Sequence, residues 1–354
     1  MAIKVLLAPL GSPTVACSRV RVYQYLPHLA AHGVTARVLP FWPRPDPNPP
    51  ARLGPRRRAA ARLRMLERVA RLAALAPHHD VTLVQRVLLP APLQRLLARR
   101  ARGLVFDVDD AISTTHPGMT DEAAWRSRVA ERYAGMLASS HAVFAATATL
   151  AAEARRHATR VFEVASPVDC DRYRPSAPGG GATAVVGWIG SPSTSMYLRA
   201  VLPACREVAA RHPQVRFEAV GADPADDLAP FRVRPWTLET ELDHLRGFDI
   251  GIMPLDDDAW ARGKAGYKLL QYMACGIASV ASPVGVSADL LGGQTRGLLA
   301  AGEAGWARAL IALIEDATLR RRLAEGGPEF VRREYSLQVW APRYRAALEA
   351  AAGA

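Results

Sequence analysis

Residues 263–285, GKAGYKLLQYMACGIASVASPVG, carry the pattern that decides the fold of this chain. Apolar residues recur at helical spacing over 269–274, and Gly276 follows at the position where a left-handed residue ends many helices. A short apolar run over 277–281 then stops at a Ser-Pro pair. The stretch therefore predicts a glycine-containing loop, a helix, a buried strand and a second glycine loop, an order typical of α/β folds.

Lysine is rare in this chain, and two of its lysines fall within the stretch. Of the 45 Lys and Arg residues, only Lys4, Lys264 and Lys268 are lysine. Lys264 and Lys268 lie one helical turn apart at the predicted helix start, where backbone amides and the helix dipole already favour an anion. A compact ammonium also binds a phosphate oxygen differently from a planar guanidinium. The pair predicts a phosphate site, with two solvated lysines on a surface helix as the alternative.

The same stretch resembles the C-terminal-domain signature of retaining glycosyltransferases of the family-4 type, which have the GT-B architecture. Many of those enzymes carry two glutamates, separated by seven residues, that lead into EAMA-G-PVVAS, where this chain reads QYMACGIASVAS. Gly263 and Gln271 stand at the two glutamate positions, so both carboxylates are absent. The sequence KLLQ is closer to a Lys-Leu-x-Glu variant found in part of the family. The Gln271 amide is still able to bind a ribose diol.

The resemblance implies an α/β fold of two Rossmann-like doubly wound domains that face each other across a cleft. It implies an acceptor-binding N-terminal domain over 1–175 and a nucleotide-sugar-binding domain over 184–336. A C-terminal helix over 337–354 would cross back to the first domain. The segment SPVDCDRYRP, residues 166–175, resembles the crossing segment of these enzymes, and the glycine-rich sequence after it is typical of a linker.

Length and composition are consistent with two ordinary domains. The chain has 354 residues, 50% of them hydrophobic, and a mean hydropathy of +0.00. No apolar run approaches the roughly 18 residues that span a bilayer, and the N-terminal apolar run is too short for a signal peptide. The four cysteines lie far apart without metal-ligand spacing. These features predict a cytoplasmic protein, and peripheral binding at the inner face of the membrane is an alternative.

The first domain opens with a predicted β-loop-α-β unit whose strands fall at 3–8 and 34–39. It lacks the G-x-G-x-x-G spacing, so a dinucleotide site is not indicated. In the resembling enzymes a glycine-rich loop after the first strand faces the cleft. The acceptor-side residues implied here are Gly11, Ser12, Ser18 and Arg19, although Arg19 is also explained as an ordinary charge in the first helical turn. Later strands are predicted at 81–85, 104–108, 142–145, 160–164, 184–190, 215–220 and 250–255.

Residues 51–75 are strongly basic. They hold eight arginines and one glutamate, which is +7 of the formal charge of +12. As a helix, the segment has an arginine face and an opposite face with Leu63, Leu66 and Ala70. A basic amphipathic helix of this kind binds an anionic membrane surface, and in the resembling enzymes lipid-linked acceptors are met in this way. A solvated helix that packs its leucines on the domain is the alternative. Nucleic acid is not indicated as a partner, because no aromatic residue interleaves with the arginines.

An acidic sequence, FDVDDAIST, runs on from the strand predicted at 104–108. Asp107-Val108-Asp109 matches the Asp-x-Asp element with which another class of glycosyltransferase holds a metal, but no other ligand cluster accompanies it and no metal is predicted. The resemblance places this strand end in the cleft. Asp109 and Asp110 are therefore predicted as catalytic residues that orient an acceptor hydroxyl or act as a general base. Capping of the following turn is the alternative.

The second domain contains further candidates for binding the donor. The turn after its first strand presents amides and hydroxyls to a pyrophosphate, although serine and threonine there are also ordinary N-caps. The segment over 232–249 corresponds to the part that cradles the base in the resembling enzymes, and packing is the alternative role for its tryptophan. The predicted nucleotide-sugar-binding residues are Gly190, Ser191, Ser193, Thr194, Arg234, Trp236, Lys264, Lys268, Gln271, Gly285 and Val286.

The resemblance implies an enzyme that moves a sugar from a nucleotide diphosphate sugar to a hydroxyl of a glycan or lipid-linked acceptor, with retention and without a cofactor. Lys264 and Lys268 would act catalytically by stabilising the leaving diphosphate. One ammonium at about 4 Å contributes on the order of 4 kcal/mol before desolvation, against roughly 0.3–1 kcal/mol from a helix dipole. A nucleotide-sugar epimerase of the same architecture and a non-catalytic nucleotide- or membrane-binding relative are the alternatives.

Overall fold

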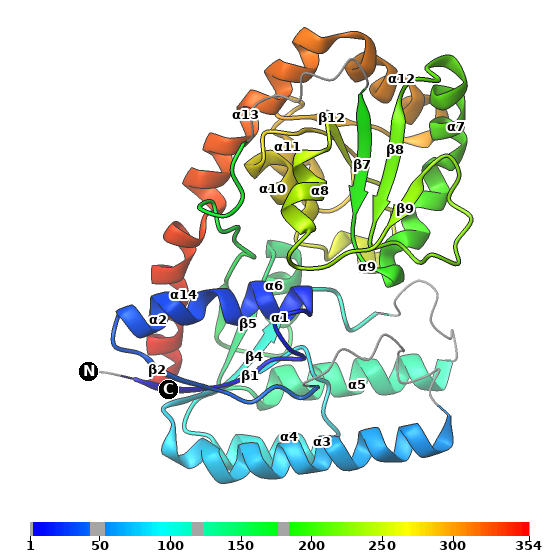
Figure 1. The fold of residues 1–354 in the computed structure, drawn as a ribbon. Helices are drawn as coiled ribbons and strands as arrows, with labels where there is room; N and C mark the ends of the chain where they lie inside the picture. Colours follow the sequence, from blue (N-terminus) through cyan, green and yellow to red (C-terminus); the bar gives the residue numbers. More distant parts are fainter. Residues whose placement is uncertain (1–2, 43–53, 115–122, 176–183, 354) are drawn as a thin grey trace. The chain divides into compact units, whose positions relative to one another are not determined.

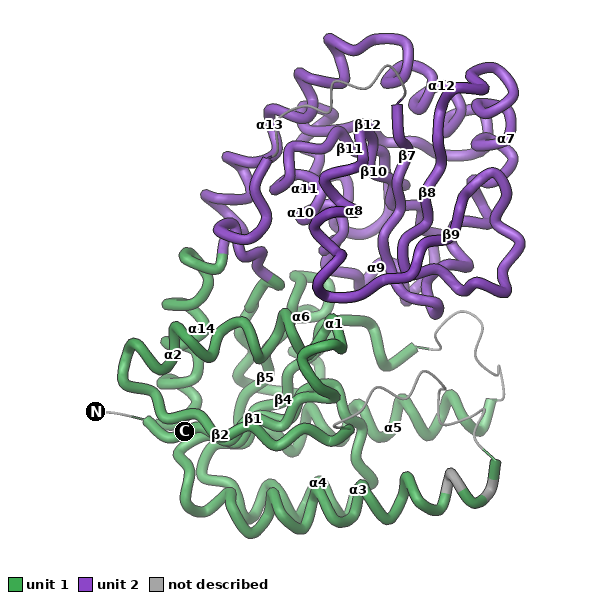
Figure 2. Tube along the Cα trace, viewed as in Figure 1, with its two compact units in different colours: residues 1–166, 337–354 green, residues 167–336 purple. Residues whose placement is uncertain are grey.

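The structure, a computed structural model, describes residues 3–42, 54–114, 123–175 and 184–353. The chain divides into two compact units, Met1–Ser166 with Leu337–Ala354, and Pro167–Ser336, which Figure 2 shows in different colours. In the described residues each unit contains a six-stranded parallel sheet with helices on both faces. The predicted α/β class with two doubly wound domains is therefore confirmed. Residues 167–175 group with the second unit, and the last helix groups with the first.

The first unit has the strand order β2-β1-β3-β4-β5-β6, with every neighbouring pair parallel. The central strands are buried at every position, as expected for a parallel sheet covered on both faces. The strands are β1 (Lys4–Ala8), β2 (Thr35–Val38), β3 (Val81–Gln85), β4 (Leu104–Val108), β5 (Ala142–Ala145) and β6 (Val161–Glu163). The α-helices are α1 (Ala16–Arg21), α2 (Leu26–Ala31), α3 (Pro55–Leu75), α4 (Ala91–Arg100), α5 (Ala123–Ser139), α6 (Ala148–Ala154) and α14 (Leu337–Ala352).

Helices from both ends of the chain cover one face of this sheet. The rings of Tyr25, which follows α1, and Tyr344 on α14 stack with centroids 4.0 Å apart. Both belong to a buried apolar cluster that also takes in β1, β3 and β5. Figure 1 shows α3, α4 and α5 side by side on the opposite face. Burial of α14 in this core explains why the C-terminal helix belongs to the first unit.

The second unit has the order β12-β11-β10-β7-β8-β9, again parallel throughout. Two very short strands, β9 and β12, were not predicted. The strands are β7 (Val185–Ile189), β8 (Arg216–Val220), β9 (Arg232–Arg234), β10 (Ile250–Met253), β11 (Ala278–Ala281) and β12 (Leu298–Leu299). The helices are the 3-10 helix η4 (Pro192–Val201) and α7 (Leu202–Arg211), α8 (Glu241–Arg246), α9 (Ala259–Arg262), α10 (Tyr267–Ala274), α11 (Ser287–Leu291), α12 (Gly302–Glu315) and α13 (Ala317–Tyr335).

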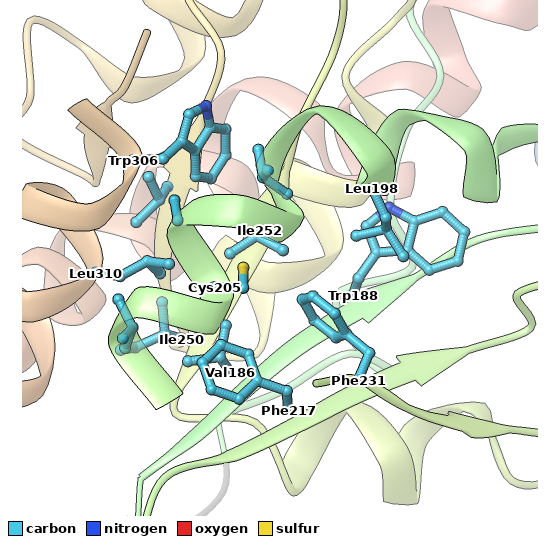
Figure 3. Packing of buried hydrophobic residues seen from close by; sticks show 14 of the residues in the cluster. Val186, Trp188, Leu198, Cys205, Phe217, Phe231, Ile250, Ile252, Trp306 and Leu310 are labelled. Carbon is cyan, nitrogen blue, oxygen red and sulfur yellow. The ribbon is translucent and has the colours of Figure 1, made fainter. Parts of the chain in front are cut away.

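Two apolar layers hold this second sheet. Figure 3 shows the first layer, in which Trp188, Cys205 and Phe217 pack with side chains of η4, α7 and α12. The second layer lies on the other face and joins α10 and α13 to the sheet. Gly327 on α13 allows close packing there, because a Cβ at this position would lie 2.8 Å from the Met273 Cα. The sheet thereby fixes α10, which carries the deciding stretch of sequence.

Helix α10 ends as its sequence predicts. Gly276 has a φ of +68°, and its N–H donates to the Met273 carbonyl at 3.0 Å. The N–H of Ile277 donates to the Tyr272 carbonyl at 2.9 Å. These two bonds form a Schellman motif, which requires a left-handed residue and so explains the glycine. The chain then enters β11 directly.

Each sheet has one point at which the strand order reverses, between β1 and β3 in the first unit and between β7 and β10 in the second. The residues that pair β7 with β10 are Val186 with Ile250 and Gly187 with Gly251. Beyond them the Tyr272 hydroxyl bridges the two strands. It accepts from the Ile189 N–H at 3.1 Å and donates to the Ile252 carbonyl at 3.2 Å. In open α/β sheets, ligands bind at the carboxyl ends of strands next to such a reversal.

Candidate functional site

The two lysines of the deciding stretch lie next to the reversal point of the second sheet. Lys268 is in the first turn of α10, with its Nζ 5.4 Å from the ring centroid of Trp188 on β7. Lys264 lies in the loop after α9, with its Nζ 5.9 Å from the Tyr197 ring and 5.7 Å from the Trp260 ring. Both side chains are half-buried. Electrostatic attraction to the aromatic rings favours these ammonium positions.

The prediction that both lysines start one helix is only half right. Helix α10 begins at Tyr267, and its N-cap, Gly266, has a left-handed φ of 67°. Lys264 therefore precedes the helix, and only Lys268 belongs to the turn whose free N–H groups favour an anion. The left-handed glycine separates the two positions.

Gly190, Lys268 and Trp236 come together at the ends of β7 and β9. A Cβ placed on Gly190 would lie 3.0 Å from the Lys268 Cε. A Cβ on Gly221, which follows β8 with a φ of +76°, would lie 3.0 Å from the Trp236 Cβ and would overlap the Gly190 carbonyl. Gly190 therefore leaves room for the Lys268 side chain, and Gly221 leaves room for Trp236. Three predicted residues are placed together, and Gly221 joins them without having been predicted.

Trp236 is held by a buried carboxylate that sequence reasoning missed. Glu241, the first residue of α8, is only 3% exposed. Its Oε2 accepts from the Trp236 indole N–H at 2.9 Å, and its Oε1 accepts from the Tyr173 hydroxyl. The Arg172 guanidinium lies 3.8 Å from the same carboxylate. The indole orientation is therefore fixed through its nitrogen, and a glutamate shortly after the tryptophan is the only sign of this in the sequence.

The remaining donor-side residues have structural partners of their own. Arg234 forms an ion pair with Glu218 on the neighbouring strand at 3.1 Å. Ser191 and Thr194 form a capping box at the start of η4, so the N-cap alternative is present in the structure. The Ser193 hydroxyl lies 3.0 Å from that of Ser191. These contacts account for the serines locally without assigning a ligand to them.

Gln271, at the position of the family's second glutamate, is 4% exposed. Its Nε2 has no hydrogen-bond partner among the described residues. Gly285 has a φ of +57°, and a Cβ there would lie 3.0 Å from the Arg262 carbonyl. The Val286 side chain packs beside Gly266, 3.0 Å from where its Cβ would be. Gly285 and Val286 therefore border the loop that carries Lys264.

In the first unit, the loop after β1 is organised by Gln85, a buried residue at the end of β3. The Gln85 Oε1 accepts from the Leu10 N–H at 2.9 Å and from the Ser18 hydroxyl at 3.1 Å. Ser18 is fully buried and accepts from the Gly11 N–H at 2.9 Å. Ser12 bonds Thr14 at 2.8 Å, and Arg19 contacts the Pro13 carbonyl at 3.4 Å. Ser18 therefore links the loop after β1 to the end of β3 through buried hydrogen bonds.

Asp109 and Asp110 share one guanidinium. The Arg86 Nη1 lies 3.2 Å from Asp109 and 2.7 Å from Asp110. Burial raises the pKa of Asp109, while Arg86 acts in the opposite direction and Asp110 adds to the rise. Both aspartates are therefore ion-paired with Arg86, a residue that sequence reasoning missed.

The Asp-x-Asp element is divided between two arginines. Asp107 is 1% exposed, and its carboxylate takes two bonds from the buried Arg21, at 3.1 and 2.6 Å. Asp109 is paired with Arg86 instead. Among the described residues no group of three or more His, Cys, Asp or Glu side chains has the arrangement of a metal site. Both carboxylates of the element therefore have ion-pair roles.

Two leucines of helix α3 are exposed. The alternative to membrane binding had been that they pack on the domain. Val69, Leu72 and Ala73 are buried, whereas Leu63 is 71% and Leu66 is 48% exposed. The predicted basic segment begins at 51, but residues 51–53 lie outside the described part of the chain. None of the helices in the described residues combines the length and apolar character needed to cross a membrane.

Comparison with known proteins connects this geometry with glycosyl transfer. Residues 183–316 match the model of the protein family described as "Glycosyl transferases group 1". A sucrose-phosphate synthase from Thermosynechococcus elongatus has a TM-score of 0.73 at 16% sequence identity, with 99% of this chain and 100% of that chain covered. HepE from Anabaena in complex with UDP and glucose has a TM-score of 0.69 at 16% identity, with 99% and 100% covered. TarM has a TM-score of 0.61 at 12% identity, with 79% and 58% covered.

No curated protein sequence matches this chain. At these identities the solved structures establish the fold alone, and that fold is GT-B, as the resemblance implied.

Proposed function

We propose, on the premise that residues 183–316 are a group 1 glycosyltransferase domain, that this enzyme moves a sugar from a nucleotide diphosphate sugar to an acceptor hydroxyl with retention of anomeric configuration. The observation that carries the proposal is the meeting of Lys268, Gly190 and Trp236 beside the reversal point of the second sheet. A cation, a close backbone approach and an aromatic ring are the groups that a diphosphate and a base require.

In this mechanism the donor diphosphate binds where Lys264 and Lys268 supply positive charge. As the bond from the sugar to the diphosphate breaks, negative charge grows on the departing phosphate oxygen, and the two ammonium groups stabilise it. Gln271 holds the ribose in place of a carboxylate, since its buried amide has an unused donor. Asp109 and Asp110 bind the acceptor hydroxyl; its oxygen forms the new bond to the anomeric carbon, and one of the two carboxylates takes its proton. These charges come from the chain itself, so the mechanism requires no metal or other cofactor.

The test begins with a panel of nucleotide diphosphate sugars, with UDP-glucose first because HepE has been solved with UDP-glucose. Binding is measured as a rise in the unfolding temperature. The donor that binds is then incubated with methyl and octyl glycosides, and NMR identifies the anomeric configuration of the product. An α-linked product from an α-linked donor supports the proposal. Inversion, or epimerisation of the donor without an acceptor, contradicts it, as does donor binding without any transfer.

We further propose that α3 binds an anionic membrane surface, so that the enzyme reaches a lipid-linked acceptor. Positions 59, 63, 66 and 70 fall on one side of the helix, and all are exposed. The exposed arginines Arg56, Arg62, Arg64 and Arg71 accompany them. Leucines that insert among lipid chains and arginines that contact acidic headgroups are complementary to such a surface, each cation near it contributing about 1 kcal/mol.

A vesicle flotation assay tests this surface. Replacing Leu63 and Leu66 with aspartate is expected to abolish flotation with vesicles that contain phosphatidylglycerol. Leu96→Asp is the matched control, because Leu96 is also an exposed leucine of the first unit, at 39%, but lies on α4. Equal flotation of the double variant and the control would exclude α3 as the membrane contact.

A further inference from the structure

Arg86 occupies an unusual position for an arginine. It directly follows β3, at the reversal point of the first sheet, and its φ of +64° lies in the left-handed region. A side chain other than glycine seldom adopts this conformation, which costs free energy unless the surroundings enforce it. Its N–H continues the sheet by donating to the Asp107 carbonyl at 2.9 Å. The backbone therefore directs the guanidinium toward the end of the next strand, where the two aspartates lie.

The side chain of Arg86 is 19% exposed, and those of Asp109 and Asp110 are 10% and 19% exposed. Charges this far removed from water are costly unless they are paired. Because one guanidinium contacts both carboxylates, Arg86 fixes their spacing as well as their charge. The two carboxylates are a preorganised group of hydrogen-bond acceptors at the carboxyl ends of the strands, where ligands bind in open α/β sheets.

A second observation at the carboxyl ends of these strands supports the binding of a ligand there. Gln85, the residue before Arg86, is fully buried, and its Nε2 has no partner among the described residues. Cys17 on α1 is close to the ion pair, because the charges of Asp109 and Arg86 both act on its thiol, whose pKa burial raises to about 11. A buried donor and two carboxylates are therefore neighbours. Sugar hydroxyl groups, which both donate and accept, match such a set.

We propose that Arg86 is a positioning residue that holds the Asp109 and Asp110 carboxylates side by side by pairing with both, so that they accept hydrogen bonds from the hydroxyl groups of the acceptor. The inference rests on the proposed glycosyl transfer. Arg86 itself need not touch the substrate, since it acts through the two aspartates.

The direction of the pH dependence follows from the groups that face Asp109. Burial, Asp110 and Asp107 raise its pKa, while Arg86 and Arg21 lower it; the Cys17 thiol is neutral at the pH of the assay. Without Arg86, the largest opposing charge is lost and the pKa rises further. Asp109 is then ionised only at higher pH, and transfer is lost as the pH falls through its new pKa.

The experiment compares pH profiles of kcat/KM for the acceptor in the wild-type enzyme, Arg86→Met and Arg86→Lys, with UDP-glucose as the donor. In Arg86→Met the acid limb is expected to move up by about 1 to 3 pH units, the effect of one nearby opposite charge. Arg86→Lys, which keeps the charge, is expected to recover most of the activity at neutral pH. The KM for the donor stays unchanged. Arg155→Met is the matched control, because Arg155 forms an exposed ion pair with Glu163 in the same unit.

A loss in Arg86→Met that is equal at every pH, or an unchanged profile, overturns the inference. If the wild-type enzyme transfers no sugar from any donor of the panel, the proposed function fails and this inference fails with it. If the wild-type enzyme transfers sugar but Arg86→Met has an unchanged pH profile, the inference fails and the proposed function stands. Carbon-13 NMR of labelled aspartate, assigned with Asp109→Asn, follows the ionisation of Asp109 separately from turnover. An Asp109 titration that is the same with and without Arg86 contradicts the inference directly.

Discussion

Trp236 is a half-buried side chain whose orientation is fixed by one buried residue. Its indole N–H is bound by Glu241, which is itself bound by Tyr173 and lies close to Arg172. Packing alone does not require a carboxylate at this position, because burying a charge is costly. An aromatic ring fixed next to Gly221, which lies against Gly190, is suited to stacking on a base.

Trp236→Ala is expected to raise the Kd for UDP by about 5- to 150-fold, because stacking of an aromatic ring on a base contributes about 1–3 kcal/mol. Isothermal titration calorimetry measures the affinity. Trp340→Ala is the control, since Trp340 is a half-buried tryptophan on α14 of the first unit. An unchanged Kd in Trp236→Ala would show that the ring serves packing only.

Single residues could be selected as candidates from the sequence where their type or place was unusual. Lys264 and Lys268 were selected because lysine is rare in this chain, and Gly190 because it follows a predicted strand. Gln85 and Arg86 were not visible, because their roles depend on partners far away in the sequence: Gln85 bonds a hydroxyl 67 residues before it, and Arg86 a carboxylate 23 residues after it. Only the folded sheet brings such residues together.

At the scale of elements, α10 links the deciding stretch of sequence to the reversal point of the second sheet. Its Tyr272 ring lies over Gly251, where a Cβ would be 2.5 Å from the ring Cγ. Its hydroxyl bridges β7 and β10 just where those strands stop pairing. The same helix therefore holds the separating strands together and carries Lys268 to their ends.

Tyr272→Phe is expected to lower the free energy of unfolding by about 1–3 kcal/mol, because the Ile189 N–H is left buried without a partner. Urea unfolding followed by fluorescence measures the change. The control is Tyr133→Phe in the first unit, whose buried hydroxyl has no partner among the described residues and whose removal is expected to be nearly neutral. Equal effects of the two substitutions would contradict a bridging role for Tyr272.

Most elements were predictable because parallel strands buried on both faces are nearly continuous apolar runs. The strands predicted at 81–85, 104–108 and 142–145 coincide with β3, β4 and β5. β9 and β12 were missed because two or three residues give no periodic signal, and pairing with a neighbouring strand creates them. The 3-10 form of η4 was likewise not apparent, since its apolar spacing also fits an α-helix.

At the scale of the whole molecule, the chain leaves the first unit at Ser166 and returns to it at Leu337. The sequence predicted this return through a family resemblance, and Tyr344 supplies the physical reason by stacking on Tyr25 in the core of the first unit. Each unit has polar groups at the reversal point of its sheet. In the proposed mechanism the polar groups of the second unit bind the donor, and those of the first unit bind the acceptor.

The central claim is that Lys264 and Lys268 stabilise the charge that develops on the departing diphosphate. The most direct measurement is kcat for sugar transfer by Lys264→Ala and Lys268→Ala, with Lys4→Ala as the control at the only other lysine of the chain. We expect kcat to fall by about 100- to 1,000-fold in Lys268→Ala, as when one charge-stabilising donor is removed from an active site. The unfolding temperature should stay close to that of Lys4→Ala. A kcat near the wild-type value in both Lys264→Ala and Lys268→Ala would contradict the claim.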